Sequence, residues 1–130
     1  MSTTTDASNS ASLSLPSHVS PAVKQALSEA KQRLQAMYGN RLRHVILYGS
    51  RARGDARPEG HPSGGSDVDI LVVLDDDTDR YAEVKRLAGL KMTLFERHRL
   101  TLSFKPYTKE AYQDLRRPFM QNVHAEGIAL

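Results

Sequence analysis

The stretch LYGSRARGDARPEGHPSGGSDVDILVVL, residues 47–74, decides the fold. It begins at the end of an apolar run, passes through a loop rich in glycine, arginine and proline, and enters a second apolar run headed by Asp67 and Asp69. Short apolar runs bounded by turn residues are typical of buried strands. The stretch therefore predicts two strands, at residues 44–48 and 67–74, that lie side by side and antiparallel.

The two aspartates lie at the start of the second strand. Side chains at positions i and i+2 of a strand share a face and lie roughly 6.5 Å apart along the chain. Two carboxylates this close raise each other's proton affinity unless a cation binds between them. Oxygen ligands without histidine or cysteine suit Mg²⁺, which completes its shell with substrate phosphates. Asp67 and Asp69 are thus predicted metal ligands and catalytic residues.

Gly49 and Ser50 follow the first strand directly. A glycine there allows a sharp turn and a close approach to a ligand, and the exposed backbone N–H groups of such a turn can bind an anion. Nearby arginines can neutralise phosphate charge. The Gly-Lys-Ser/Thr ending of a P-loop is absent, so this is not a Walker-type site. The residues predicted to bind a nucleotide are Gly49, Ser50, Arg51 and Ser66.

Each of these signals has a simpler interpretation when it is taken alone. A Gly-Ser pair after a strand is usually only a turn, and an Asp-x-Asp pair is usually a solvated strand start. Arginines in a loop usually face water. The combination is far more specific, because a strand, a Gly-Ser turn, a basic loop and a Ser-Asp-x-Asp strand follow one another in order.

The rest of the chain alternates helical patterns with one more strand. Ser20 and Pro21 start a helix that Gly39 ends. The acids of residues 75–79 suit the start of a second helix. A third strand is predicted at 100–104 and two short helices at 109–117 and 118–126. The apolar stripe of the second helix is predicted to comprise Tyr81, Val84, Leu87, Ala88 and Phe95.

This order predicts an α/β (α+β) fold with a small mixed sheet flanked by helices. Residues 1–19 are rich in Ser, Thr and Ala without periodicity, so they are predicted to be a disordered tail, and residues 20–130 are predicted to form one domain. With no cysteine, no apolar run of about 18 residues and no secretory leader pattern, the chain is expected to be cytoplasmic and to have no membrane segment.

The motifs GSRARG and SDVDILVVL resemble those of the minimal nucleotidyltransferases of the DNA polymerase β superfamily, over about residues 22–128. The resemblance implies the polymerase-β-like fold and transfer of a nucleoside monophosphate from an NTP, with ATP the first candidate, to a hydroxyl. By the same resemblance Gly49 and Ser50 hold the triphosphate, and Asp67 and Asp69 hold Mg²⁺. Many such domains are antitoxins paired with a HEPN-domain protein, which makes that protein, an RNA acceptor and an oligomer the partners to consider.

Two departures from the family pattern affect this interpretation. The loop between Ser50 and Asp67 holds sixteen residues where about ten are common. Active members also carry a third carboxylate on the next strand, where this chain has Thr101 and Ser103, and Glu96 falls before that strand. Two hypotheses follow. The chain is a Mg²⁺-dependent nucleotidyltransferase, or it is a binding module of the same fold with weak or no turnover that neutralises a partner by direct contact.

Overall fold

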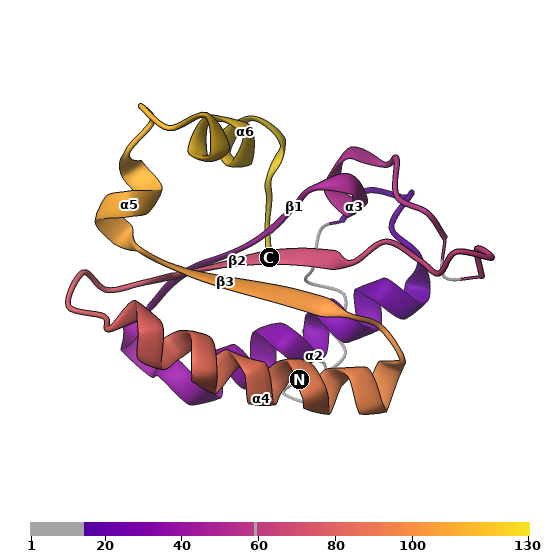
Figure 1. The fold of residues 1–130 in the computed structure, drawn as a ribbon, viewed down its shortest axis with the longest axis horizontal. Helices are drawn as coiled ribbons and strands as arrows, with labels where there is room; N and C mark the ends of the chain where they lie inside the picture. The colour runs from indigo at the N-terminus through magenta and orange to yellow at the C-terminus, as the bar shows by residue number, and fades with distance from the viewer. Residues whose placement is uncertain (1–14, 59) are drawn as a thin grey trace, which may run out of the picture.

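The computed structural model describes residues 15–58 and 60–130 and has the predicted mixed α/β architecture (Figure 1). In chain order the elements are α2 (Pro21–Tyr38), η1 (Gly39–Arg41), β1 (Leu42–Tyr48), α3 (Ser50–Arg53), β2 (Val68–Leu74), α4 (Arg80–His98), β3 (Leu102–Thr108), α5 (Lys109–Gln113), α6 (Pro118–Glu126) and β4 (Ile128–Ala129).

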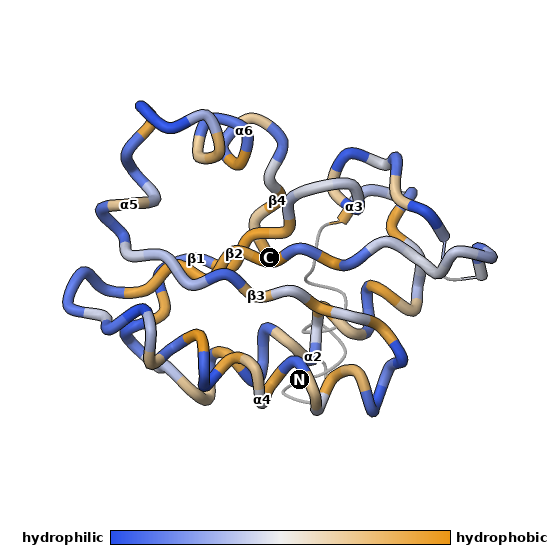
Figure 2. The backbone as a smooth tube through the Cα atoms, in the orientation of Figure 1, coloured by the Kyte–Doolittle hydropathy of each residue, from blue (hydrophilic) through white to orange (hydrophobic). Residues whose placement is uncertain are grey.

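The sheet has the strand order β3-β2-β1-β4. β1 and β2 pair antiparallel, as predicted, while β2 and β3 pair parallel because the long helix α4 connects them. Helices α2 and α4 cover one face of the sheet, and α5 and α6 cover the other (Figure 1). The two central strands are therefore buried on both sides, which explains why β2 is apolar along nearly its whole length (Figure 2).

Each face of the sheet packs a separate core. Leu47 and Ile70 are fully buried against α2 and α4. Leu71 and Val73, which alternate with Ile70 along β2, are fully buried against α6 on the opposite face. Since side chains alternate between the faces of a strand, Asp69 lies on the same face as Leu71, the face that α6 covers.

The prediction for the apolar stripe of α4 was wrong except for Leu87. The residues that face the core are Glu83, Leu87, Leu90 and Leu94. The other four predicted residues, together with Met92, are exposed. The helix carries two apolar stripes, and the leucine stripe is the one that packs on the sheet.

Three other boundaries differ from the prediction. β3 runs on to Thr108 because an edge strand tolerates Pro106, which cannot donate a ladder hydrogen bond. The two-residue strand β4 was not predicted because it is too short to show a pattern. The five-residue helix α5 is capped by the side chain of Thr108, as predicted, but ends at Gln113.

Part of the predicted tail belongs to the domain. Residues 1–14 lie outside the described residues, but Val19, which precedes α2, is buried in the same core as the apolar side of that helix. Nε2 of His18 hydrogen-bonds the carbonyl oxygen of Arg51 at 3.0 Å. Within the described residues, packing against the core therefore extends from Ser20 back to Leu15. Within the described ranges, none of the helices combines the length and apolarity needed to cross a membrane.

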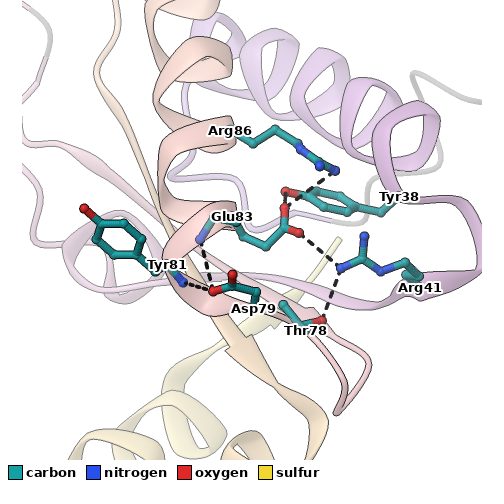
Figure 3. Close-up of polar contacts among 8 residues, drawn as sticks. Tyr38, Arg41, Thr78, Asp79, Tyr81, Glu83 and Arg86 are labelled. Carbon is teal, nitrogen blue, oxygen red and sulfur yellow. Dashed lines mark hydrogen bonds and ion pairs between the residues drawn. The ribbon is translucent and has the colours of Figure 1, made fainter.

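A buried polar cluster fastens α4 to the end of α2 (Figure 3). Glu83 is only 3% exposed, and its two carboxylate oxygens accept hydrogen bonds from the Tyr38 hydroxyl at 2.8 Å and from Arg41 Nη2 at 3.1 Å. Burial and the bond to Glu83 raise the pKa of Tyr38, so its hydroxyl stays protonated and keeps donating. This cluster explains how an acid is tolerated among the core-facing residues of α4.

Candidate functional site

The two aspartates lie where β2 begins. Asp67 is exposed just before the strand, and Asp69 is partly buried within it, opposite Tyr48 of β1. Burial raises the pKa of Asp69, and the negative charge of Asp67 raises it further. Lys105 and Arg53 oppose this effect because their positive charges lie nearby. The site thus places two carboxylates of like charge together, with Asp69 partly shielded from water.

This donor set fits a hard cation. Within residues 15–58 and 60–130, no three His, Asp or Glu side chains gather closely enough to form a complete metal site. Two carboxylates, however, match the usual protein share of a Mg²⁺ site, in which waters and substrate phosphates supply the remaining ligands. The raised pKa of Asp69 also favours a cation site, because a bound cation would relieve the repulsion between the two acids.

Gly49 joins the end of β1 to the short helix α3 and lies beside Asp69. Its backbone has φ 78° and ψ −159°, a conformation that is essentially reserved for glycine. A Cβ built on Gly49 would overlap a carboxylate oxygen of Asp69 and lie 3.3 Å from Cγ of that residue. No other residue type fits there, and the Gly49–Ser50 turn lies directly against the Asp69 carboxylate. The structure therefore brings the two sequence motifs together.

The other predicted nucleotide-binding residues shape the loop. Ser50 starts the single turn α3, and its carbonyl oxygen accepts hydrogen bonds from the backbone N–H groups of Gly54 and Asp55. Arg51 is only 7% exposed, and its Nη2 donates to the carbonyl oxygen of Ser66 at 2.8 Å. Arg51 thus ties the start of α3 to the residue that precedes Asp67.

Ser66 also closes the long loop at its base. Its hydroxyl accepts a hydrogen bond from the backbone N–H of Arg57 at 2.8 Å, and its own N–H donates to the carbonyl oxygen of Arg57 at 3.1 Å. The extra residues of the loop lie between these two positions. The base of the insertion is therefore closed by two hydrogen bonds between Arg57 and Ser66.

Two cations lie near Asp69: Arg53, one of the loop arginines expected to neutralise phosphate charge, and Lys105, which was not predicted. Arg53 is exposed at the end of α3, where its Nη1 lies 3.3 Å from a carboxylate oxygen of Glu126. Lys105 of β3 pairs with Leu71, so it shares the face of Asp69. Ending the predicted strand at residue 104 concealed Lys105, although the period-two pattern from Ser103 would have found it.

Tyr48 was also missed, because its strand reads simply as apolar. It is 7% exposed, and its hydroxyl is the one buried side-chain polar atom of the described residues without a hydrogen-bond partner. Burial and the nearby negative charge of Asp69 raise the pKa of Tyr48, so the group is a protonated donor. Buried polar groups are nearly always satisfied, which makes this hydroxyl a candidate contact for a ligand.

β3 contributes no acid to this side of the sheet. Ser103 pairs with Asp69, so the position beside the aspartate holds a hydroxyl. Glu96 is exposed on α4, which packs on the opposite face, so it does not reach the site.

Known proteins are similar to the part of the chain that contains the candidate site. A family model described as "Nucleotidyltransferase domain" covers residues 27–119, which include the whole site. A Methanocaldococcus jannaschii protein with the provisional name protein adenylyltransferase is 41% identical over 56 residues, 43% of this chain and 50% of that protein. This chain therefore spans half the length of the curated relative it matches.

Two of the solved structures that match this chain are toxin–antitoxins. A toxin–antitoxin crystallised with AMP-PNP has a TM-score of 0.51 at 19% identity, over 78% of this chain and 69% of that chain. A mutant of the MntA–HpeT toxin–antitoxin has a TM-score of 0.47 at 20% identity over the same shares of the two chains. At these identities the first likeness concerns the fold alone.

Proposed function

Because the chain belongs to the nucleotidyltransferase domain family, we propose that it transfers a nucleoside monophosphate from a nucleoside triphosphate to a hydroxyl group of a protein or an RNA. The acceptor oxygen forms a bond to the α-phosphorus, and pyrophosphate leaves. The observation that carries this proposal is the contact between the Gly49 backbone and the Asp69 carboxylate. This contact brings together, in one site, a turn that can bind phosphate and two acids that can bind a cation.

Asp67 and Asp69 are the proposed ligands of Mg²⁺, which when bound neutralises phosphate charge. Gly49 and Ser50 are the proposed contacts of the triphosphate. Arg53 is proposed as a further phosphate contact, since it is a cation at the end of the same turn.

The hydroxyl of Tyr48 gains a hydrogen-bond acceptor when a ligand occupies the site. Arg51 and Ser66 act on the nucleotide through the loop, because their hydrogen bonds hold its two ends together. Their roles are to position the turn and Asp67 relative to each other.

ATP is the proposed donor and a protein hydroxyl the first acceptor to test. The provisional name of the M. jannaschii relative describes transfer of an adenylyl group to protein. One solved structure of similar fold is that of a toxin–antitoxin with AMP-PNP. A HEPN-domain protein is accordingly the proposed partner and acceptor, an RNA is the alternative acceptor, and assembly into an oligomer with the partner is part of the proposal.

The test is incubation with Mg²⁺ and ATP labelled at either the α- or the γ-phosphate. We expect label from α-labelled ATP to appear on the HEPN-domain protein or RNA supplied, and label from γ-labelled ATP to remain in pyrophosphate. Transfer of the γ-label would identify a kinase instead. No transfer to protein or RNA would remove the support for catalysis.

A second candidate function is a binding module that neutralises its partner by direct contact. The observation that favours it is Ser103, a hydroxyl residue rather than an acid at the position beside Asp69 on the next strand. A binding module would inhibit its partner without ATP, and the D67N/D69N variant would inhibit equally well. An enzyme would require both ATP and the two aspartates.

Replacing Ser103 with aspartate is expected to accelerate transfer. The new carboxylate would lie beside Asp69 and could accept the proton of the attacking hydroxyl, an effect typically worth about 10²–10⁴-fold. Thr101→Asp is the comparison, because Thr101 precedes β3 and lies two positions before Ser103, the residue that pairs with Asp69. Single-turnover transfer from labelled ATP measures both variants. A wild-type rate that already equals the Ser103→Asp rate would show that another acid fills this role.

A further inference from the structure

The outer face of α4 is an unusual surface for this domain. Four of the five large apolar side chains that are exposed in the described residues lie on this one helix. They are Tyr81 (73% exposed), Val84 (49%), Met92 (60%) and Phe95 (41%). With the exposed Ala88 they follow the spacing i, i+3, i+7, i+11, i+14, so they form one stripe about 21 Å long. We call these five residues the outer stripe.

The outer stripe lies in a strongly basic setting. Residues 80–99 contain six Lys or Arg and two Glu, a net charge of +4, whereas the whole chain carries +3. One of the two acids, Glu83, is buried on the opposite side of the helix. Near the ends of the stripe, Lys85 lies over the ring of Tyr81 at 5.3 Å and Arg99 over the ring of Phe95 at 5.7 Å. Neither cation forms an ion pair with another described residue.

Gly89 gives an independent indication of a partner. It stands in the middle of a 19-residue helix, where glycine lowers stability relative to alanine. Nothing within the described chain requires it, because a Cβ at this position would meet no atom within 4 Å. Gly89 is exposed beside Ala88 and one turn from Met92. Gly89 borders the outer stripe between Lys85 and Met92, and a glycine that the chain itself does not require at this border leaves room for a backbone that approaches from outside.

We propose that the outer stripe and Gly89 form a docking surface for a protein that presents an amphipathic helix with acidic flanks. The apolar side of that helix would cover the stripe, its carboxylates would meet Lys85 and Arg99, and Gly89 would let the two helices pack closely. This surface lies on the α4 side of the sheet, whereas Asp69 lies on the α6 side. The partner can therefore stay bound while the candidate site remains open.

Charge and shape exclude the other occupants. A second copy of the chain would bring two basic α4 helices together, which is unfavourable. A nucleic acid would match the cations but would leave the apolar side chains against phosphates. A lipid surface adapts to side chains of any size, so it gives no reason for a glycine at position 89. An acidic protein helix satisfies the apolar stripe, the cations and the glycine at once.

The test uses two labelled helical peptides with the same leucine stripe, one flanked by glutamates and the other by lysines. We expect the acidic peptide to bind the full-length chain about 10-fold tighter or more by fluorescence anisotropy, and to bind more weakly at high salt. Amide chemical-shift changes should be confined to the exposed side of α4.

Two variants and two matched controls locate the surface. Gly89→Leu and Met92→Gln are each expected to weaken binding about 10-fold or more. Gly60→Leu is the control for the first, because a Cβ on Gly60 also meets nothing within 4 Å, and Leu115→Gln is the control for the second, because Leu115 is also half-exposed. Thermal melts of all four confirm that they fold.

Several outcomes would overturn the proposal. They are equal binding of the two peptides, no binding of the acidic peptide at about 1 mM, and loss of binding in the control variants. Dimerisation of the chain through α4, or preferential binding of anionic vesicles or RNA at this face, would assign the surface to a different occupant. None of these results depends on whether the chain transfers a nucleotide, so the proposal fails or stands separately from the proposed function.

Discussion

The D67N/D69N variant is expected to lose nucleotidyl transfer by about 10³-fold or more. Asparagine keeps the size of each side chain but removes the two negative charges that would hold the cation. Losing the charge neutralisation of a bound metal costs several kcal/mol of transition-state stabilisation, and each 1.36 kcal/mol is tenfold in rate. Single-turnover transfer from α-labelled ATP measures the loss, and calorimetry with Mg²⁺–ATP should show the affinity falling in parallel.

The same variant should not be less stable than the wild type. Burial and the charge of Asp67 raise the pKa of Asp69, so its ionised form is disfavoured in the folded protein. At neutral pH this charge opposes folding, and a neutral side chain removes the penalty. We expect a melting temperature at or above that of the wild type without metal. Asp77→Asn, an exposed aspartate in the turn before α4, is the control and should change neither property. Unchanged transfer by the double variant would rule out Asp67 and Asp69 as the metal site.

Gly49→Val is expected to remove both nucleotide binding and transfer. Any side chain at this position overlaps the carboxylate of Asp69, and the backbone conformation of Gly49 is strained for every residue with a Cβ. Asp69 must therefore move away, or the turn must open. Either movement separates the phosphate contacts from the metal ligands. Calorimetry with Mg²⁺–ATP and the transfer assay measure the effect, and Gly49→Ala should show the same loss with less crowding.

Gly54→Ala separates backbone strain from the contact with Asp69. Gly54 also has a positive φ, 94°, but a Cβ there would meet the ring of His18 at 3.4 Å and not an aspartate. Left-handed backbone costs a residue with a Cβ about 1–2 kcal/mol, so both glycine variants should melt earlier than the wild type. Only the Gly49 variants should lose transfer. If Gly49→Val binds nucleotide normally, the turn is purely structural.

The sequence predicted the central strands and the relation between the two motifs because both depend on local rules. A short apolar run predicts a buried strand, and the period of two places Asp67 and Asp69 on one face. The closeness of Gly49 to Asp69 then follows from pairing β1 with β2. These features are set within 30 residues of continuous chain, so no distant contact is needed to infer them.

The features that the sequence did not predict depend on contacts between distant segments. α4 has two apolar stripes, and only the packing of its leucines against the sheet decides which one is buried. Arg51 was predicted to contact the nucleotide, and nothing in the sequence indicated the hydrogen bond that it donates to the carbonyl oxygen of Ser66, 15 positions away. Lys105 was missed because the predicted strand stopped at residue 104, whereas β3, an edge strand that tolerates Pro106, continues to Thr108.

Both borders of the sheet are closed to further strands. On one border β3 carries Lys105 and Pro106, the kinds of residue that discourage a neighbouring chain from pairing there. On the other border β4 pairs with Ile46 and Leu47 of β1, and the backbone N–H of Leu130 donates to the carbonyl oxygen of Val45. The apolar strand β1 is thereby kept from acting as a template for intermolecular strand addition. Association by sheet extension and strand-mediated aggregation are both disfavoured, so we expect contacts with other proteins to form through helices and loops.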